Sequence, residues 1–74
     1  MGLKSYQQII RELREDRDLS QADIAKVLGT TQQMYSRYEN STCEMPIRHL
    51  IELCEFYGVS ADYILGRTGR DSDH

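Results

Sequence analysis

The sequence of 74 residues has no tryptophan, one proline, and no apolar run that approaches the roughly 20 residues needed to cross a bilayer. The segment from Met1 to Ser5 also lacks the charged and then apolar pattern of a secretory signal peptide. Internal repeats, low-complexity tracts and linkers are absent as well. These absences argue against a membrane or secreted protein, and they predict one small soluble domain of the cytoplasm.

Cysteine is scarce, and the two that occur, Cys43 and Cys54, are too few for a disulfide framework and do not form a Cys-x-x-Cys motif. We therefore expect free thiols that are buried or incidental. A zinc site could be drawn from these two residues with His49 and His74, but the spacing matches none of the usual pairings. No metal, cofactor or small-molecule ligand is expected.

Catalytic groupings are also missing. Neither histidine has a nearby nucleophile or a paired-carboxylate arrangement, and no glycine-rich phosphate loop exists in the sequence. The sequence therefore argues against an enzyme, and we expect His49 to lie on the surface.

Positive charge is limited: nine basic residues stand against twelve acidic ones, for a net charge of −3. This balance argues mildly against a nucleic-acid partner, because proteins that neutralise phosphates usually carry a basic footprint. It does not exclude such a partner, since the acidic residues crowd the ends of the first predicted helix, the stretch 43–56 and the C-terminal tail.

Helical periodicity is abundant, and it predicts an all-α fold of five helices without strands. In the first segment Tyr6, Ile9, Ile10 and Leu13 fall within one arc at about 100° per residue. The second segment, "LSQADIAKVLG", begins with a capping Ser20 and ends at Gly29, which is expected in the left-handed conformation.

The C-terminal half contains two further helix signals. Pro46 suits a first helical position and precedes a wide apolar face that ends at Gly58; the face comprises Ile47, Leu50, Ile51, Leu53, Cys54 and Tyr57. The segment "GVSADYILG" repeats the earlier pattern, with a capping Ser60 and a terminal Gly66. We predict a domain over 1–66 and a flexible tail over 67–74.

Between these segments lies "TTQQMYSRYEN", a helical stretch with an unusual polar side. On a helical wheel Met34, Tyr35 and Tyr38 form the apolar side, and uncharged groups dominate the other; that polar side comprises Gln32, Gln33, Ser36, Arg37 and Asn40. A glutamine amide matches the N6 and N7 atoms of adenine in the major groove, and an arginine matches O6 and N7 of guanine.

A polar stripe is by itself common on solvated helices, so the alternative is an ordinary exposed face. The context favours base reading, because the stripe follows a capped helix, a glycine turn and two threonines. This is the order of a helix-turn-helix motif.

The segment "LSQADIAKVLGTTQQMYSRYEN", followed by Pro46 and "GVSADYILG", resembles the helix-turn-helix domain of the lambdoid phage repressor and Cro family. That family is also called the xenobiotic-response-element family of bacterial regulators. The resemblance covers about residues 6–66, with several motifs in the same order and spacing.

The resemblance implies a five-helix domain whose third helix, about 31–39, enters the major groove. It implies that Gln32, Gln33, Ser36 and Arg37 face base edges or nearby phosphates. Gln21 would hold a phosphate and brace the reading side chains, although an ordinary exposed first-turn residue is the alternative. Thr31 would cap the third helix and contact DNA, while Thr30 with Gln33 also fits a capping box.

The loop after the third helix departs from the family pattern. Relatives often have a glycine after the asparagine and basic residues before the proline, whereas this chain has Ser41 and Glu44 at such places. Phosphate binding would then depend on Asn40, Ser41 and Thr42 together with backbone amides and scattered arginines. We expect modest DNA affinity with a shallow salt dependence.

Two further expectations concern structure and assembly. The family pairs an arginine of the first helix with a glutamate of the third, which here are Arg14 and Glu39. One domain covers too few base pairs for specificity, so a homodimer on a two-fold site is expected. Its surface would use the apolar residues at the end of helix four and in helix five, for which core burial is the alternative: Phe56, Tyr57, Tyr63 and Ile64.

These patterns together predict a sequence-specific regulator of transcription, specifically a repressor of phage or mobile-element type, with a double-stranded DNA operator as its partner. The alternative is an antitoxin-like or anti-repressor-like module that keeps the fold but binds mainly another protein. The acidic balance and the uncharged loop are compatible with that alternative.

Overall fold

A computed structural model describes residues 5–66, and every regular element within that range is a helix, as predicted. The helices are α1 (Tyr6–Asp16), α2 (Gln21–Leu28), α3 (Gln32–Glu39), α4 (Ile47–Tyr57) and α5 (Ala61–Ile64). The predicted tail, 67–74, lies outside the described residues. None of the helices in 5–66 is both long and apolar enough to pass through a bilayer.

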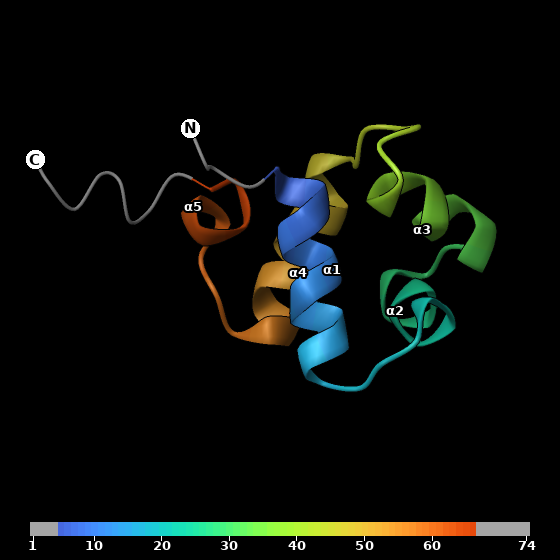
Figure 1. Ribbon diagram of the computed structural model, residues 1–74, viewed down its shortest axis with the longest axis horizontal. Helices are drawn as coiled ribbons and strands as arrows, with labels where there is room; N and C mark the ends of the chain where they lie inside the picture. Colours follow the sequence, from blue (N-terminus) through green and yellow to red (C-terminus); the bar gives the residue numbers. More distant parts are fainter. Residues whose placement is uncertain (1–4, 67–74) are drawn as a thin grey trace, which may run out of the picture.

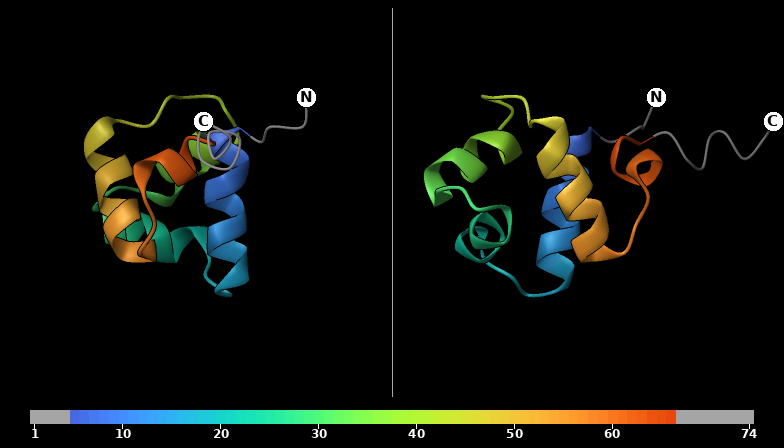
Figure 2. Two further views of the ribbon diagram at one scale, coloured as in Figure 1. Left: turned by 90° about the vertical axis from the view of Figure 1, so that its left-hand side faces the viewer. Right: turned by 180° about the vertical axis from the view of Figure 1, so that it is seen from behind.

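The helices are arranged around a central pair, α1 and α4. In Figure 1 and in the two views of Figure 2, α2 and α3 lie on one side of this pair and α5 lies on the other. The strongest inter-helix packing joins α2 to α3, which makes the helix-turn-helix unit, and α1 also packs against α3. The third helix is therefore supported from behind by two helices.

All five helices contribute apolar side chains to one core. Its buried members are Ile9, Ile10, Leu13, Ile24, Ala25, Leu28, Tyr35, Tyr38, Leu53, Tyr57 and Ile64. Cys43 and Cys54 are free thiols packed against this core, which agrees with the expectation from their scarcity.

Side-chain caps define where four of the helices begin, and α1 begins after Ser5, whose hydroxyl accepts a hydrogen bond from the Gln8 amide. In the same way, the hydroxyls of Ser20, Thr31 and Ser60 at the starts of α2, α3 and α5 accept hydrogen bonds from backbone amides three residues later. These bonds satisfy amides that have no partner within the helix. Gly29 ends α2 with φ of +70°, a left-handed conformation that costs glycine little, and so permits the tight turn into α3.

The predicted position of Pro46 is wrong by one residue. Pro46 occupies the N-cap, with extended backbone angles of −62° and 151°, and α4 begins at Ile47. Proline has no amide hydrogen to donate, so it suits either position at a helix start.

The predicted exposure of His49 is also wrong. Its side chain is buried beside the ring of Tyr38, with 5.8 Å between ring centroids, and Nδ1 lies 3.2 Å from the Glu52 carboxylate. Conversely, Ile47 and Ile51 were predicted on the apolar face of α4 but are exposed. The predicted Leu53 and Tyr57 are buried together with His49, and the predicted Leu50 and Cys54 pack against the core.

Candidate nucleic-acid interface

The third helix has two chemically distinct faces. Tyr35 and Tyr38 are buried against the core, whereas Gln32, Gln33 and Arg37 are exposed. The buried tyrosines meet edge to face, with 6.2 Å between their ring centroids. Aromatic packing on one side of a helix only two turns long fixes which side chains point outward on the other.

An open hollow of about 550 Å³ lies between the start of α2 and the outward face of α3. Five of the predicted DNA-binding residues line it: Gln21, Gln32, Gln33, Ser36 and Arg37. The structure thus brings a residue of α2 and four residues of α3 together on one surface. The lining offers amide and hydroxyl groups and a single cationic charge, that of Arg37.

The remaining predicted DNA-binding residues, which lie at the ends of α3 and in the loop after it, do not line the hollow. Thr31 is exposed, and its hydroxyl accepts the Met34 amide hydrogen at 3.1 Å, which assigns the cap to Thr31 rather than Thr30. Asn40 ends α3 and donates from Nδ2 to the Ser36 hydroxyl at 3.3 Å. Ser41 and Thr42 are exposed in the loop that follows.

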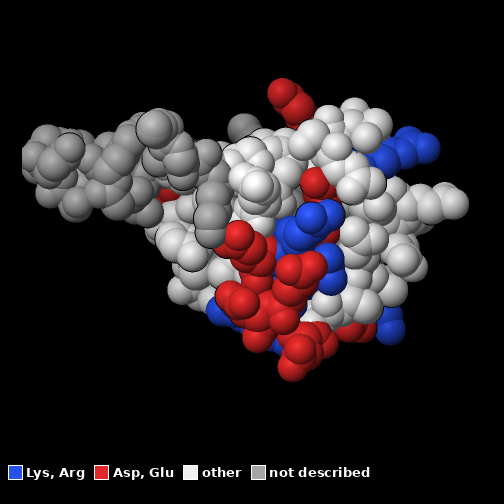
Figure 3. Space-filling view, viewed as in Figure 1, with Lys and Arg blue, Asp and Glu red and all other residues white. Residues whose placement is uncertain are grey.

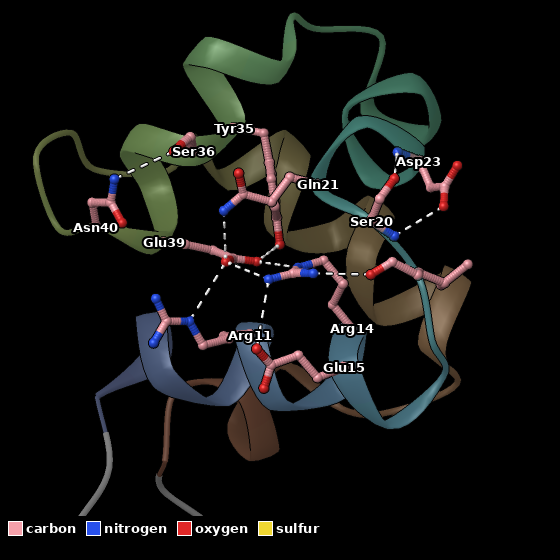
Figure 4. Close-up of polar contacts among 11 residues, drawn as sticks. Arg11, Arg14, Glu15, Ser20, Gln21, Asp23, Tyr35, Ser36, Glu39 and Asn40 are labelled. Carbon is pink, nitrogen blue, oxygen red and sulfur yellow. Dashed lines mark hydrogen bonds and ion pairs between the residues drawn. The ribbon is translucent and has the colours of Figure 1, made fainter.

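A buried carboxylate, that of Glu39, connects α3 to α1 and α2 (Figure 4). Arg14 of α1 donates to it twice, from Nε at 2.8 Å and from Nη2 at 3.1 Å. The Tyr35 hydroxyl donates to the same carboxylate at 2.6 Å, and Gln21 Nε2 donates at 3.1 Å. We call these four residues, Arg14, Gln21, Tyr35 and Glu39, the carboxylate network.

The carboxylate network includes contacts that sequence reasoning missed. The pairing of Arg14 with Glu39 followed from the family resemblance, but the bonds from Tyr35 and Gln21 did not. Tyr35 precedes Glu39 by four residues, a spacing that places two side chains on the same helix face and was the available signal. No comparable signal existed for Gln21, which lies on another helix.

Gln21 therefore has a second role beside the hollow. One hydrogen of its amide is bound by Glu39, so the amide group has a fixed orientation while the side chain still lines the hollow. A fixed amide presents its oxygen and its second hydrogen in set directions, which suits recognition of a phosphate or of a neighbouring glutamine.

The protonation of the carboxylate network follows from its contacts. Burial opposes ionisation of Glu39, but the hydrogen bonds from Arg14, Tyr35 and Gln21 together outweigh it and hold the pKa of that carboxyl below its ordinary value. Burial, followed by the bond to Glu39, raises the pKa of the Tyr35 hydroxyl. Glu39 is therefore an anion at neutral pH and Tyr35 remains a hydrogen-bond donor to it.

Charges are unevenly distributed over the surface. Figure 3 shows acidic side chains gathered over α1, while the side that carries α2 and α3 is largely uncharged with a few basic groups. Among residues 5–66 no cluster of three or more His, Cys, Asp or Glu side chains is placed to hold a metal ion.

Two of the four residues predicted for a dimer surface cannot serve there. Tyr57 and Ile64 are buried in the core, so their prediction is corrected in favour of the core alternative. Phe56 and Tyr63 remain 45% and 46% exposed. Residue type alone could not distinguish the exposed Phe56 and Tyr63 from the buried Tyr57 and Ile64, because all four side chains are large and largely apolar.

Comparison with known proteins places this geometry among regulators of transcription. The family model described as "Helix-turn-helix" matches residues 10–64. The chain is 36% identical over 63 residues to the HTH-type transcriptional regulator YobD of Bacillus subtilis, covering 85% of this chain and 56% of that protein.

Two further relatives have different roles, one as a repressor and one as an antitoxin. The cryptic phage CTXphi transcriptional repressor RstR of Vibrio cholerae is 38% identical over 50 residues, which is 68% of this chain and 45% of that protein. The antitoxin PezA of Streptococcus pneumoniae is 33% identical over 57 residues, which is 77% of this chain and 36% of that protein. The chain thus spans about half the length, or less, of these curated relatives.

Among solved structures, the P22 c2 repressor protein in complex with a synthetic operator has the same arrangement of helices. It superposes with a TM-score of 0.78 at 26% identity, covering 86% of this chain and 97% of that one.

Proposed function

Because this chain belongs to the helix-turn-helix family of DNA-binding, phage-repressor-like transcriptional regulators, we propose that it is a repressor that recognises a double-stranded operator in a sequence-specific way. In this proposal α3 enters the major groove, and two copies bind a two-fold site. The protein would act in the cytoplasm, where its operator lies, and would catalyse no reaction.

The observation that carries the proposal is the hollow between α2 and α3. Residues of α2 and α3 converge there with their hydrogen-bonding groups pointing outward. The carboxylate network joins these two helices, because Gln21 of α2 donates to Glu39 of α3. Gln32 and Gln33 offer paired donors and acceptors for adenine, and Arg37 offers a fork for guanine. Groups of this kind discriminate between bases, whereas lysines would bind phosphates without discriminating.

Other polar groups would position α3 on the DNA backbone. Gln21 in the hollow, and Thr31, Asn40, Ser41 and Thr42 outside it, can each donate to a phosphate oxygen. The similarity to the P22 c2 repressor supports this arrangement, since that protein was solved with operator DNA and shares the helix order.

The proposal is tested by selecting duplexes from a random pool and measuring their binding by fluorescence anisotropy. We expect an enriched two-fold site whose binding is weakened by about 1 to 3 kcal/mol in each of Gln33→Ala and Arg37→Ala. Gln7→Ala serves as the matched control, because this glutamine lies on α1 outside the hollow.

The measurement is repeated at two salt concentrations to separate base reading from phosphate attraction. Binding that depends only on salt, and is equal in wild type and both variants, would contradict the role of α3. No enrichment from the pool would contradict sequence-specific recognition altogether.

A second candidate function is an antitoxin-like module that binds mainly another protein. Two observations favour it: the similarity to the antitoxin PezA, and the net charge of −3. The two candidate functions differ in whether binding depends on the residues that line the hollow. Gln33→Ala and Arg37→Ala would leave the binding of a protein partner on another face unchanged, whereas they impair DNA recognition.

A further inference from the structure

Arg11 is an arginine of α1 whose guanidinium makes no hydrogen bond with any residue in the range 5–66. Its one polar contact in that range is an ion pair in which Nε lies 3.8 Å from Glu39 Oε1. Figure 4 shows this side chain reaching from α1 toward the carboxylate on α3. The side chain is 51% exposed, so its N–H donors are accessible to a ligand from outside.

Glu39 is already satisfied without Arg11. One carboxylate oxygen accepts from Arg14 Nη2 and Gln21 Nε2, and the other accepts from Arg14 Nε and the Tyr35 hydroxyl. Arg14 also neutralises the charge of the carboxylate, because it binds both oxygens. Arg11 therefore adds a surplus positive charge, and a half-exposed ion pair of this length contributes little to stability.

The surplus charge lies at the edge of the hollow between α2 and α3. Gln21 lines the hollow, and its Nε2 donates to the same Glu39 oxygen at 3.1 Å. Arg11 Nε and Gln21 Nε2 are thus separated by at most the sum of their two distances to that oxygen. The second amide hydrogen of Gln21 is not used by Glu39, so α1 and α2 bring two sets of donors to one place.

This combination of groups suits an anion with more than one oxygen. A guanidinium donates several N–H groups in a plane and binds phosphate oxygens in pairs. The neighbouring amide adds a further donor. Arg37 is the only cationic residue that lines the hollow itself, so a second positive charge at its edge matters for any ligand with a phosphate backbone.

We propose that Arg11 binds a backbone phosphate of DNA at the edge of the hollow, beside Gln21. On binding, the guanidinium moves from Glu39 to the phosphate, while Arg14 keeps the carboxylate paired. The inference rests on the proposed function, and it adds a residue of α1 to a surface otherwise assigned to α2, α3 and the loop after α3. Such a contact positions the domain on the duplex without reading a base.

Anisotropy titrations of the enriched duplex over a range of salt concentrations test this role with Arg11→Gln. The variant removes the charge but keeps a polar side chain. Loss of one phosphate contact should reduce the slope of log K against log salt by about 0.9 and weaken binding about fivefold or more near 0.1 M salt. Lys26→Gln is the matched control, because Lys26 is an exposed cation of α2 that does not line the hollow, and its slope should stay close to that of wild type.

Two further comparisons separate a phosphate contact from base reading. Arg11→Gln should weaken binding by the same factor on the enriched duplex and on one with an altered half-site, so the ratio of the two affinities stays constant. Arg11→Lys should regain most of the salt slope, because it keeps the charge. Thermal melting followed by circular dichroism verifies that each variant folds.

The contact is located with duplexes in which one phosphate at a time is replaced by an uncharged methylphosphonate. We expect one position at which the replacement weakens binding of wild type but not of Arg11→Gln. A partly unfolded variant cannot imitate this result, because its loss of affinity would be the same at every position.

An enriched duplex that Arg11→Gln binds with the wild-type slope would overturn the inference and leave the proposed function intact. A methylphosphonate scan with the same sensitive positions in both proteins would do the same. If no duplex is enriched, the proposed function fails, and the slope is measured on an unselected duplex, because non-specific binding uses the same phosphates. A reduced slope there would still support the role of Arg11, whereas an unchanged slope, or no binding at low salt, would overturn it too.

Discussion

At the scale of single residues, Glu39 is a centre of contacts, because its carboxylate accepts hydrogen bonds from Arg14, Gln21 and Tyr35. Its side chain is 0% exposed and Arg14 is 12% exposed, so the pair is shielded from water. A carboxylate in such a place is stable only while its donors remain, because an unpaired buried charge carries a large desolvation cost. Three helices are joined through this one group.

We predict that Arg14→Ala will lower the free energy of unfolding by about 3 to 5 kcal/mol, because it strands the Glu39 charge in the interior. A domain of this length has a total stability of roughly 4 to 11 kcal/mol, so the loss is a large fraction of the whole. Urea denaturation measures it. Arg11→Ala is the control, because Arg11 is half exposed and lies 3.8 Å from the same carboxylate. Equal losses in the two variants would contradict the prediction.

The lowered pKa of Glu39 predicts a dependence of stability on acid. A carboxyl whose pKa is lower in the folded state stabilises the fold above its unfolded value, near 4.5, and loses that contribution as the pH falls through the folded pKa. The unfolding free energy of wild type should therefore fall more steeply below pH 4.5 than that of Glu39→Gln. Parallel pH profiles for the two proteins would show that Glu39 is not linked to acid unfolding.

At the scale of elements, the turn after α3 contains an uncommon conformation. Ser41 has φ of +66°, in the left-handed region that costs a residue with a Cβ atom about 1 kcal/mol. Glycine would adopt this conformation without that cost, because it has no Cβ atom.

We predict that Ser41→Gly will raise the free energy of unfolding by about 0.5 kcal/mol, since relief of strain exceeds the added freedom of the unfolded chain. Ser41→Ala is the matched control, because it removes the hydroxyl but keeps the Cβ atom, and it should give no increase. Chemical denaturation compares all three proteins. A decrease in Ser41→Gly would mean that the hydroxyl stabilises the turn more than the strain destabilises it.

Helix starts could be predicted from sequence because their determinants are local. A serine or threonine that binds the amide three residues later acts within one turn, so Ser20 and Ser60 were identifiable without any tertiary information. The outward side of α3 was predictable for a similar reason, since three large side chains define its apolar arc.

Burial along α4 was harder to predict because it depends on angle as well as on residue type. Relative to Leu53, His49 lies at only about 40° and Tyr57 at a similar angle, whereas Ile47 and Ile51 lie at about 120° and 160°. Residue type favoured burial of the isoleucines, whereas the angle around the helix favoured burial of His49.

The contact of Arg17 with Tyr57 joins residues far apart in sequence, with the Arg17 guanidinium 4.9 Å from the centre of the Tyr57 ring. Nothing local signals it.

At the scale of the whole molecule, the charge distribution predicts how binding responds to salt. Arg37 is the one charged residue at the hollow, and Glu44 lies in the loop where a phosphate could pass. Few counterions would then be released on binding. We predict a slope of log K against log salt shallower than about −5, the value for six phosphate contacts.

Anisotropy titrations of the enriched duplex between low and physiological salt measure this slope. Glu44→Gln is the matched variant, because it removes one negative charge without adding a positive one, and it should strengthen binding at low salt. A steeper slope in wild type would mean that scattered arginines contact more phosphates than the hollow suggests.

The separation between the exposed lining of the hollow and the buried carboxylate network also bears on how such a protein can change over generations. Gln32 and Gln33 are exposed, so under the proposed function replacing them would alter which DNA is preferred at little cost to folding. Arg14, Tyr35 and Glu39 lie behind them and constrain one another, so they can change only together. After a gene duplication, two copies could therefore diverge to separate operators through a few surface substitutions while inheriting the same frame.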